Sequence, residues 1–79
     1  MALAKYAVVR SGEMWTVRYD KRNYGSFKSQ QDAIDYAIKT AYRIGEKGHD
    51  AQVLVQGINN RLRVEWVYGK SPDPPKDPE

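Results

Sequence analysis

The sequence predicts an α+β protein in which one helix packs on one face of a four- to five-stranded antiparallel sheet. Two segments, 6–20 and 51–68, alternate apolar and polar residues around short turn sequences, as hairpins do. Between them, residues 29–47 carry apolar side chains every three to four positions, which is typical of a helix with one buried side. The expected order is β-β-(β)-α-β-β, where the bracket marks a short third strand.

The first hairpin is predicted to turn near Gly12 and Glu13. Trp15 and Val17 alternate with polar neighbours and therefore share one face of the second strand. A two-residue turn places Val8 on that face, whereas a three-residue loop places it on the other. The sequence leaves both registers open, and we favour the two-residue turn.

Residues 20–27, DKRNYGSF, predict a polar turn followed by a short edge strand. The helix then begins at Ser29, a good N-cap, with Asp32 near the positive helix end, and Gly48 offers the stop. Small residues on the buried stripe indicate that the helix lies close to the sheet. That stripe consists of Ile34, Ala37, Ile38, Ala41 and Gly45.

The segment 51–68 predicts a second hairpin with a two-residue turn at Asn59-Asn60, because Asn tolerates the positive φ of a type I′ turn. This register pairs Val55 with Val64 and Val53 with Trp66 on the buried face, and Leu62 falls on the same face. The face without the helix then receives Gln52, Leu54, Gln56, Arg61, Arg63, Glu65 and Val67.

The chain is expected to form one domain, residues 1–70, followed by a flexible proline-rich tail, residues 71–79. Four of the residues between 72 and 78 are prolines, and P-x-x-P spacing occurs at Pro72–Pro75 and again at Pro75–Pro78. That spacing suits a polyproline II ligand for an aromatic groove. A solvated terminus without a partner is the alternative, and the composition favours it.

The order of these features resembles a family of short bacterial and phage proteins catalogued only as a domain of unknown function. The features are Trp15-x-Val17, the helix led by Ser29, the terminal hairpin, and Tyr68-Gly69 followed by prolines. The resemblance covers most of residues 6–75, and the chain has Asn59-Asn60 where an Asp-Gly turn is more usual. It implies a small α+β domain and brings no activity and no site residues.

The composition excludes several classes of protein. The 79 residues include no cysteine, which excludes disulfides and thiolate zinc sites. The start lacks a secretory leader, and no apolar run approaches the roughly 20 residues of a membrane helix. We therefore expect a soluble, cytoplasmic protein with no membrane contact.

Reactive groups do not converge in the sequence. His49 is the single histidine and adjoins Asp50 in a predicted turn, without a nucleophile or a second base in view. Asp32, Asp35 and Glu46 share the outer side of the helix without a histidine or cysteine, as solvated carboxylates do. We expect no enzyme, no cofactor and no metal site.

The net charge is +3, and the candidate binding surface is the helix-free sheet face, because basic side chains are predicted to gather there. Its predicted residues are Arg18, Lys21, Arg22, Tyr24, Arg61 and Arg63. Because Met14, Leu54 and Val67 expose apolar area among them, the leading hypothesis is contact with an unknown protein partner or with a second copy, as in a homodimer. The alternative is a nucleic-acid-binding module, since arginines interleaved with an aromatic side chain suit phosphates and bases.

Overall fold

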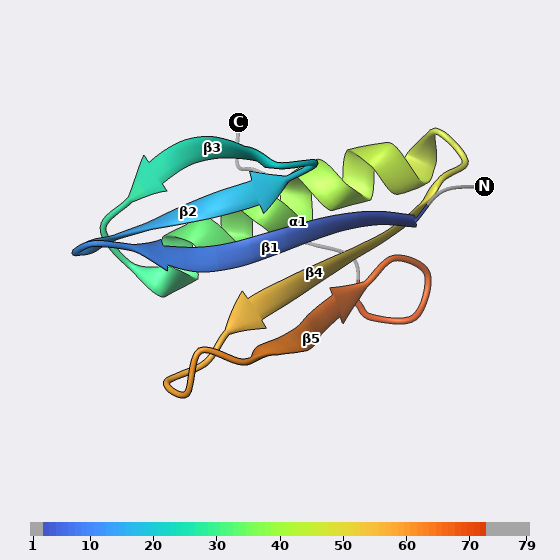
Figure 1. Ribbon diagram of the computed structural model, residues 1–79. Helices are drawn as coiled ribbons and strands as arrows, with labels where there is room; N and C mark the ends of the chain where they lie inside the picture. The colour runs from blue at the N-terminus through green and yellow to red at the C-terminus, as the bar shows by residue number, and fades with distance from the viewer. Residues whose placement is uncertain (1–2, 73–79) are drawn as a thin grey trace.

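Residues 3–72, which the computed structural model describes, form five strands and one helix. They follow one another as β1 (Leu3–Ser11), β2 (Met14–Tyr19), β3 (Arg22–Phe27), α1 (Gln30–Glu46), β4 (Asp50–Gln56) and β5 (Leu62–Val67). The strands make one sheet in the order β3-β2-β1-β4-β5, and α1 lies across one face of it (Figure 1). The predicted α+β class and the order of the elements are confirmed.

The sheet is mixed and mostly antiparallel, whereas a wholly antiparallel sheet was expected. β1 and β4 run parallel, with Tyr6 opposite Val53 and Val8 opposite Val55, and the other neighbouring strands are antiparallel. The direction follows from the connection through α1. Because β3 already runs in the direction of β1, the crossover helix returns β4 in that same direction beside β1.

The first hairpin has the favoured two-residue turn. Ser11 pairs with Met14 across Gly12 and Glu13, and Gly12 adopts a φ of 63°, which glycine tolerates without strain. The register places Val8 opposite Val17, and both side chains are fully buried. The face of β1 that contacts the helix is therefore the one that carries Val8.

The helix begins and ends where its cap residues indicate. The Ser29 side chain accepts a hydrogen bond from the backbone N–H of Asp32 at 3.1 Å, which fixes the first turn. At the other end, Gly48 has a φ of 98° and turns the chain toward β4. The buried residues of α1 are Ala33, Ile34, Ala37, Ala41 and Gly45. Four of the five belong to the predicted stripe; Ile38 is only partly buried.

The core lies between α1 and the sheet. Val8, Val17, Val53 and Val55 are its largest fully buried side chains, one or two from each of the central strands β2, β1 and β4. A wider set of buried residues surrounds them, and small helix residues let the backbone of α1 approach the sheet closely.

The second hairpin differs from the prediction. Its loop has three residues, because Gly57 N–H donates to the Arg61 carbonyl at 2.8 Å and only Asn60 in the loop takes a positive φ, 63°. This shifts the register, so that Val55 pairs with Arg63 and Leu54 with Val64. The predicted pairing of Val55 with Val64 is therefore wrong.

A β-bulge restores the predicted register further along β5. The register changes between Val53 and Leu54, with Glu65 as the extra residue, and Trp66 lies opposite Val53 as predicted. Trp66 is 5% exposed, and its burial is the physical reason for the bulge, since the three-residue loop alone would turn this ring to the other face.

The contacts of the chain with β5 continue through Pro72. The Trp66 indole Nε1–H donates to the Pro72 carbonyl at 2.8 Å, and Val67 N–H donates to the Ser71 hydroxyl at 3.0 Å. The expected tail, 71–79, thus starts with two hydrogen-bonded residues. The rest of it, residues 73–79, lies outside the described residues, so its expected flexibility stays a prediction.

A chain that ends at Lys70 should be less stable than a chain that ends at Pro72, by about 1–2 kcal/mol. The shorter chain leaves the nearly buried Trp66 donor without its acceptor, which costs about 1–3 kcal/mol unless water replaces it. Urea denaturation of the two chains measures the difference. In a Trp66→Phe background the difference should shrink, because the donor is gone. Equal stability of the two original chains would show that the Pro72 carbonyl contributes nothing.

Candidate functional site

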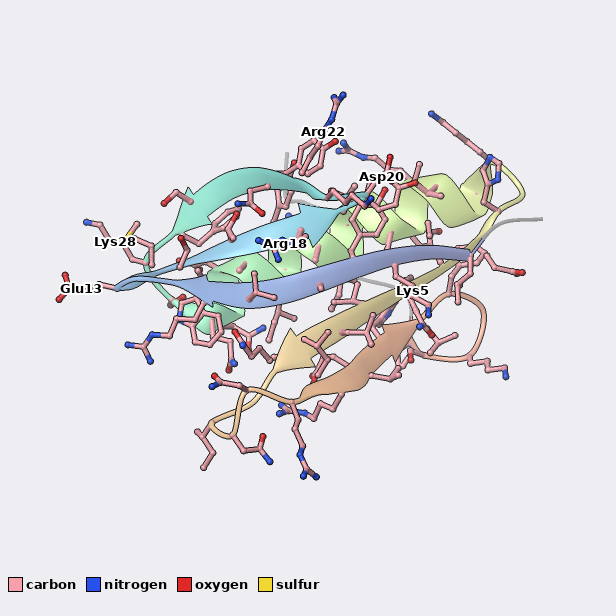
Figure 2. The ribbon with its side chains drawn as sticks, viewed as in Figure 1. Lys5, Glu13, Arg18, Asp20, Arg22 and Lys28 are labelled. Atoms are coloured by element: carbon pink, nitrogen blue, oxygen red, sulfur yellow. The ribbon has the colours of Figure 1, made fainter. Side chains whose placement is uncertain are left out.

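The six residues predicted to form one basic face lie in three separate places. Arg18 is on the helix-free face of β2, where its Nε–H donates to the Asn23 side chain at 3.2 Å (Figure 2). Lys21 lies in the two-residue turn between β2 and β3, and Arg22 follows it opposite Tyr19. Asp20 and Lys21 have φ values of 50° and 67°, as a type I′ turn requires.

Tyr24 points to the helix side of the sheet, not to the face of Arg18. It lies opposite Val17, whose side chain is fully buried under α1, so the two share that side. A β-bulge between Trp15 and Val17 sets this register, and the Thr16 hydroxyl donates to the Gly25 carbonyl at 2.8 Å within it.

Arg63 is also absent from the helix-free face, which corrects the prediction. It pairs with the buried Val55 and therefore points to the helix side, at the edge of the sheet. Its guanidinium lies 3.5 Å from the Glu65 carboxylate, and both side chains are exposed, so this ion pair adds little stability. Arg61 lies in the loop before β5 begins. The three-residue loop between β4 and β5 is the reason that both Arg61 and Arg63 lie away from the helix-free face.

Within residues 3–72, the net charge of the helix-free sheet face is consequently close to zero. Lys5 and Arg18 stand on the neighbouring strands β1 and β2 (Figure 2), and Asp50 begins β4 on the same face. In the sheet order, two strands separate β2 from β5, so Arg18 lies about 14 Å from β5 at the usual strand spacing. A continuous basic surface does not form there.

Apolar side chains occupy this face instead. Ala7, Leu54 and Val64 are direct cross-strand neighbours on β1, β4 and β5. Leu62 is 50% exposed and Val64 is 54% exposed, although the sequence assigned both to the core side. We define the apolar sheet surface as Ala7, Val9, Leu54, Leu62, Val64 and Val67. The alternation of β5 showed that Leu62 and Val64 share a face, but not which face.

A second feature lies on the helix side, where four tyrosines surround a cavity of about 210 Å³. This tyrosine cleft is lined by Tyr6, Tyr19, Tyr24 and Tyr36, together with Val17 and Thr40. The rings of Tyr6 and Tyr19 are stacked, with centroids 4.5 Å apart and planes 14° apart. Burial, and after it the neighbouring tyrosines of the cleft, raises the pKa of the Tyr6 hydroxyl above its usual value.

The outer wall of the tyrosine cleft is accessible. Tyr24 is 38% exposed and Tyr36 is 40% exposed, and the Thr40 hydroxyl donates to the Tyr36 carbonyl at 3.0 Å. Sequence reasoning assigned Tyr24 to the helix-free sheet face and did not single out Tyr36. No local sequence pattern links Tyr24 to Tyr36. The two residues become neighbours because the β2–β3 register turns Tyr24 to the helix side, where α1 carries Tyr36.

Around His49 the neighbours are mostly apolar. This side chain lines a cavity of about 200 Å³ with Leu3, Ala4, Tyr19 and Ile44. Within residues 3–72, no three His, Asp or Glu side chains gather closely enough to hold a metal ion.

Comparisons of the chain with protein families, with curated protein sequences and with solved structures found no match. The fold and its surfaces define a class only: a small α+β protein with one helix over a five-stranded sheet and two accessible features, the apolar sheet surface and the tyrosine cleft. In the described part of the chain, α1 is neither long nor apolar enough to cross a bilayer.

Proposed function

We propose that the protein is a non-catalytic binding module that associates with a second copy of itself through the apolar sheet surface. The observation that supports this most is the run of apolar side chains over three strands of a sheet face that α1 leaves uncovered. Contiguous exposed apolar surface on a small protein is typical of a contact site.

A second copy is the partner that this face fits best. In a two-fold contact the same patch meets itself, so an apolar stripe faces an apolar stripe and the few charges lie at the margin. The molecule measures 34 × 33 × 20 Å. Its broad face therefore offers roughly 900 Å², and a stable contact uses roughly 800 Å² from each partner. Because the net charge of the face is close to zero, electrostatic repulsion between two copies is small.

Nucleic-acid binding through the same face is the alternative, and it has less support. It needs several cations on one surface to neutralise phosphates. Of the six predicted residues, Arg18 alone has a strand position that faces this side, with Lys5 as a further cation. A cytoplasmic location remains part of the proposal, and the lack of cysteine is compatible with it.

Replacing Leu62 and Val64 by lysine should convert a two-chain species to single chains. Both side chains are at least half exposed, so the fold should persist while like charges meet in the contact. Sedimentation equilibrium should give twice 9.1 kDa for the original chain and 9.1 kDa for the variant.

The matched control is the double variant Arg61→Glu with Arg63→Glu on the same hairpin, which should leave the mass unchanged. An original chain of 9.1 kDa at every concentration would contradict self-association. If Lys5→Glu with Arg18→Glu, the two cations of the helix-free face, instead removed a salt-dependent affinity for single-stranded nucleic acid, the alternative would be supported.

A further inference from the structure

The tyrosine cleft has the size and the lining of a site for one aromatic ring. Its volume is about 210 Å³, and a dry protein cavity of roughly 150 Å³ is already large enough to hold benzene. Four phenol rings and Val17 line the cleft, and a flat ring packs well on aromatic side chains in stacked or edge-to-face arrangements. Drug-sized ligands occupy larger pockets, of roughly 300 Å³ or more. The cleft therefore fits a single ring with a small substituent.

Contacts between rings hold the walls of the cleft in place. Tyr6 and Tyr19 stack on each other with centroids 4.5 Å apart, and Tyr36 packs on Phe27 with centroids 5.3 Å apart. The Thr40 hydroxyl is held by its hydrogen bond to the Tyr36 carbonyl. A ligand thus meets side chains that lose little rotational freedom when it binds.

Charged groups lie beside the cleft and not in its lining. Among the described residues that line it, none carries a carboxylate, an ammonium or a guanidinium group. Arg22 lies directly opposite Tyr19 and therefore on the same side of the sheet. Arg43 follows Thr40 by three positions and therefore shares its side of α1. Both arginines are exposed, and within residues 3–72 neither has an ion-pair partner.

These charges favour an anionic ligand over a cationic one. A guanidinium without a partner binds a carboxylate or a phosphate through charge-assisted hydrogen bonds. Lys21 adds a positive charge in the turn before Arg22, and Asp20 in the same turn offsets one charge. Burial raises the pKa of the Tyr6 hydroxyl, so this group stays neutral at pH 7 and does not repel an anion.

We propose that the tyrosine cleft binds a small aromatic anion, a single ring that carries a carboxylate or a phosphate. The ring lies between the tyrosines, and the anionic group points outward to Arg22 and Arg43. For a ligand of about ten non-hydrogen atoms we expect a Kd on the order of 1 mM. This inference is independent of the proposed self-association, because the cleft and the apolar sheet surface lie on opposite faces of the sheet.

A series of ligands that share one ring and differ in charge tests this assignment in the full chain. It consists of the anions benzoate and phenyl phosphate, neutral benzyl alcohol and the cation benzyltrimethylammonium, each titrated at the same ionic strength. Saturable shifts of the amide signals of Tyr24, Tyr36 and Thr40 report binding at the cleft. We expect the preferred anion to bind about tenfold more tightly than the alcohol, and the cation to bind more weakly than the alcohol. The tighter of the two anions identifies the anionic group as a carboxylate or a phosphate.

Removing the two guanidinium groups tests their role. Arg22→Gln with Arg43→Gln should weaken the binding of the preferred anion about tenfold and leave the affinity for benzyl alcohol unchanged. The matched control is Lys5→Gln with Arg18→Gln, which removes the same charge from the other face of the sheet. Because salt screens distant charges, this control should leave both affinities unchanged. An equal loss of anion affinity in the two variants would overturn the assigned role of Arg22 and Arg43.

Removing the outer wall of the cleft tests the site itself. Tyr24→Ala with Tyr36→Ala should abolish the binding of all four ligands, and both residues are exposed enough for the fold to persist. Equal affinities for anion, alcohol and cation would overturn the selection of an anion, and tightest binding of the cation would replace it by a site for an organic cation. Shifts that gather on the apolar sheet surface, or no saturable shift at the cleft up to about 20 mM ligand, would overturn the cleft as the binding site.

Discussion

Replacing Ala37 by aspartate is expected to unfold the protein at 25 °C. Ala37 is fully buried on the side of α1 that faces the sheet, in the same core cluster as Val17 and Val53. An aspartate there puts a carboxylate without a partner, and extra volume, into a close-packed interior, at a cost of about 4 kcal/mol or more. A domain of this size has a total stability of roughly 4–12 kcal/mol, and small cores fall toward the lower end.

Circular dichroism and an amide correlation spectrum of the Ala37→Asp chain measure this outcome. The matched control is Arg43→Asp, which adds the same side chain at an exposed position of the same helix. It should cost about 1 kcal/mol or less, through the unfavourable acid near the helix C-terminus. An Ala37→Asp chain with native spectra and unchanged melting would contradict the described packing of α1 on the sheet.

Gly45→Ala should destabilise the protein by about 2–3 kcal/mol, although alanine is the better helix former by about 1 kcal/mol. A Cβ at Gly45 would overlap the base of the Tyr68 ring, which cannot simply swing its far end away. That ring also packs near Tyr42 and Trp66, with centroid distances of 5.7 Å and 6.2 Å. Relief of the overlap therefore disturbs the aromatic cluster at this end of the core.

A double-mutant cycle with Tyr68→Ala tests this reason, because the effect of Gly45→Ala on stability should change sign. In a Tyr68→Ala background the overlap is absent, so Gly45→Ala should stabilise the chain by up to about 1 kcal/mol through helix propensity. Urea denaturation of the four chains supplies the numbers. Destabilisation of equal size in both backgrounds would mean that contact with Tyr68 is not the reason for glycine at this position.

Local signals in the sequence predicted the elements themselves. Ser29 and Gly48 mark the ends of α1, and both lie within two residues of the described bounds because capping depends on neighbouring residues alone. The Gly12-Glu13 turn likewise gave the register of β1 and β2. The α+β class followed from these elements, since one amphipathic helix needs one sheet face to bury its stripe.

The binding surfaces depended on registers that the sequence did not determine. Whether Leu62 and Val64 or Arg63 faces away from the helix turns on one residue of loop length, because successive strand side chains point to opposite faces. Asn59-Asn60 is compatible with either loop. The three-residue loop that forms places Leu62 and Val64 on the open face, and the bulge after them returns Trp66 to the buried side.

By itself, then, the sequence determined the strands, the helix, their order and the stripe of α1 that is buried, because each rests on contacts within a few residues. Only the tertiary structure decided that β4 runs parallel to β1, that Leu62 and Val64 lie on the open face, and that Tyr24 and Tyr36 share a cleft. These features depend on which distant segments become neighbours. That is set by the burial of large side chains over the whole sheet, and no short window of sequence contains it.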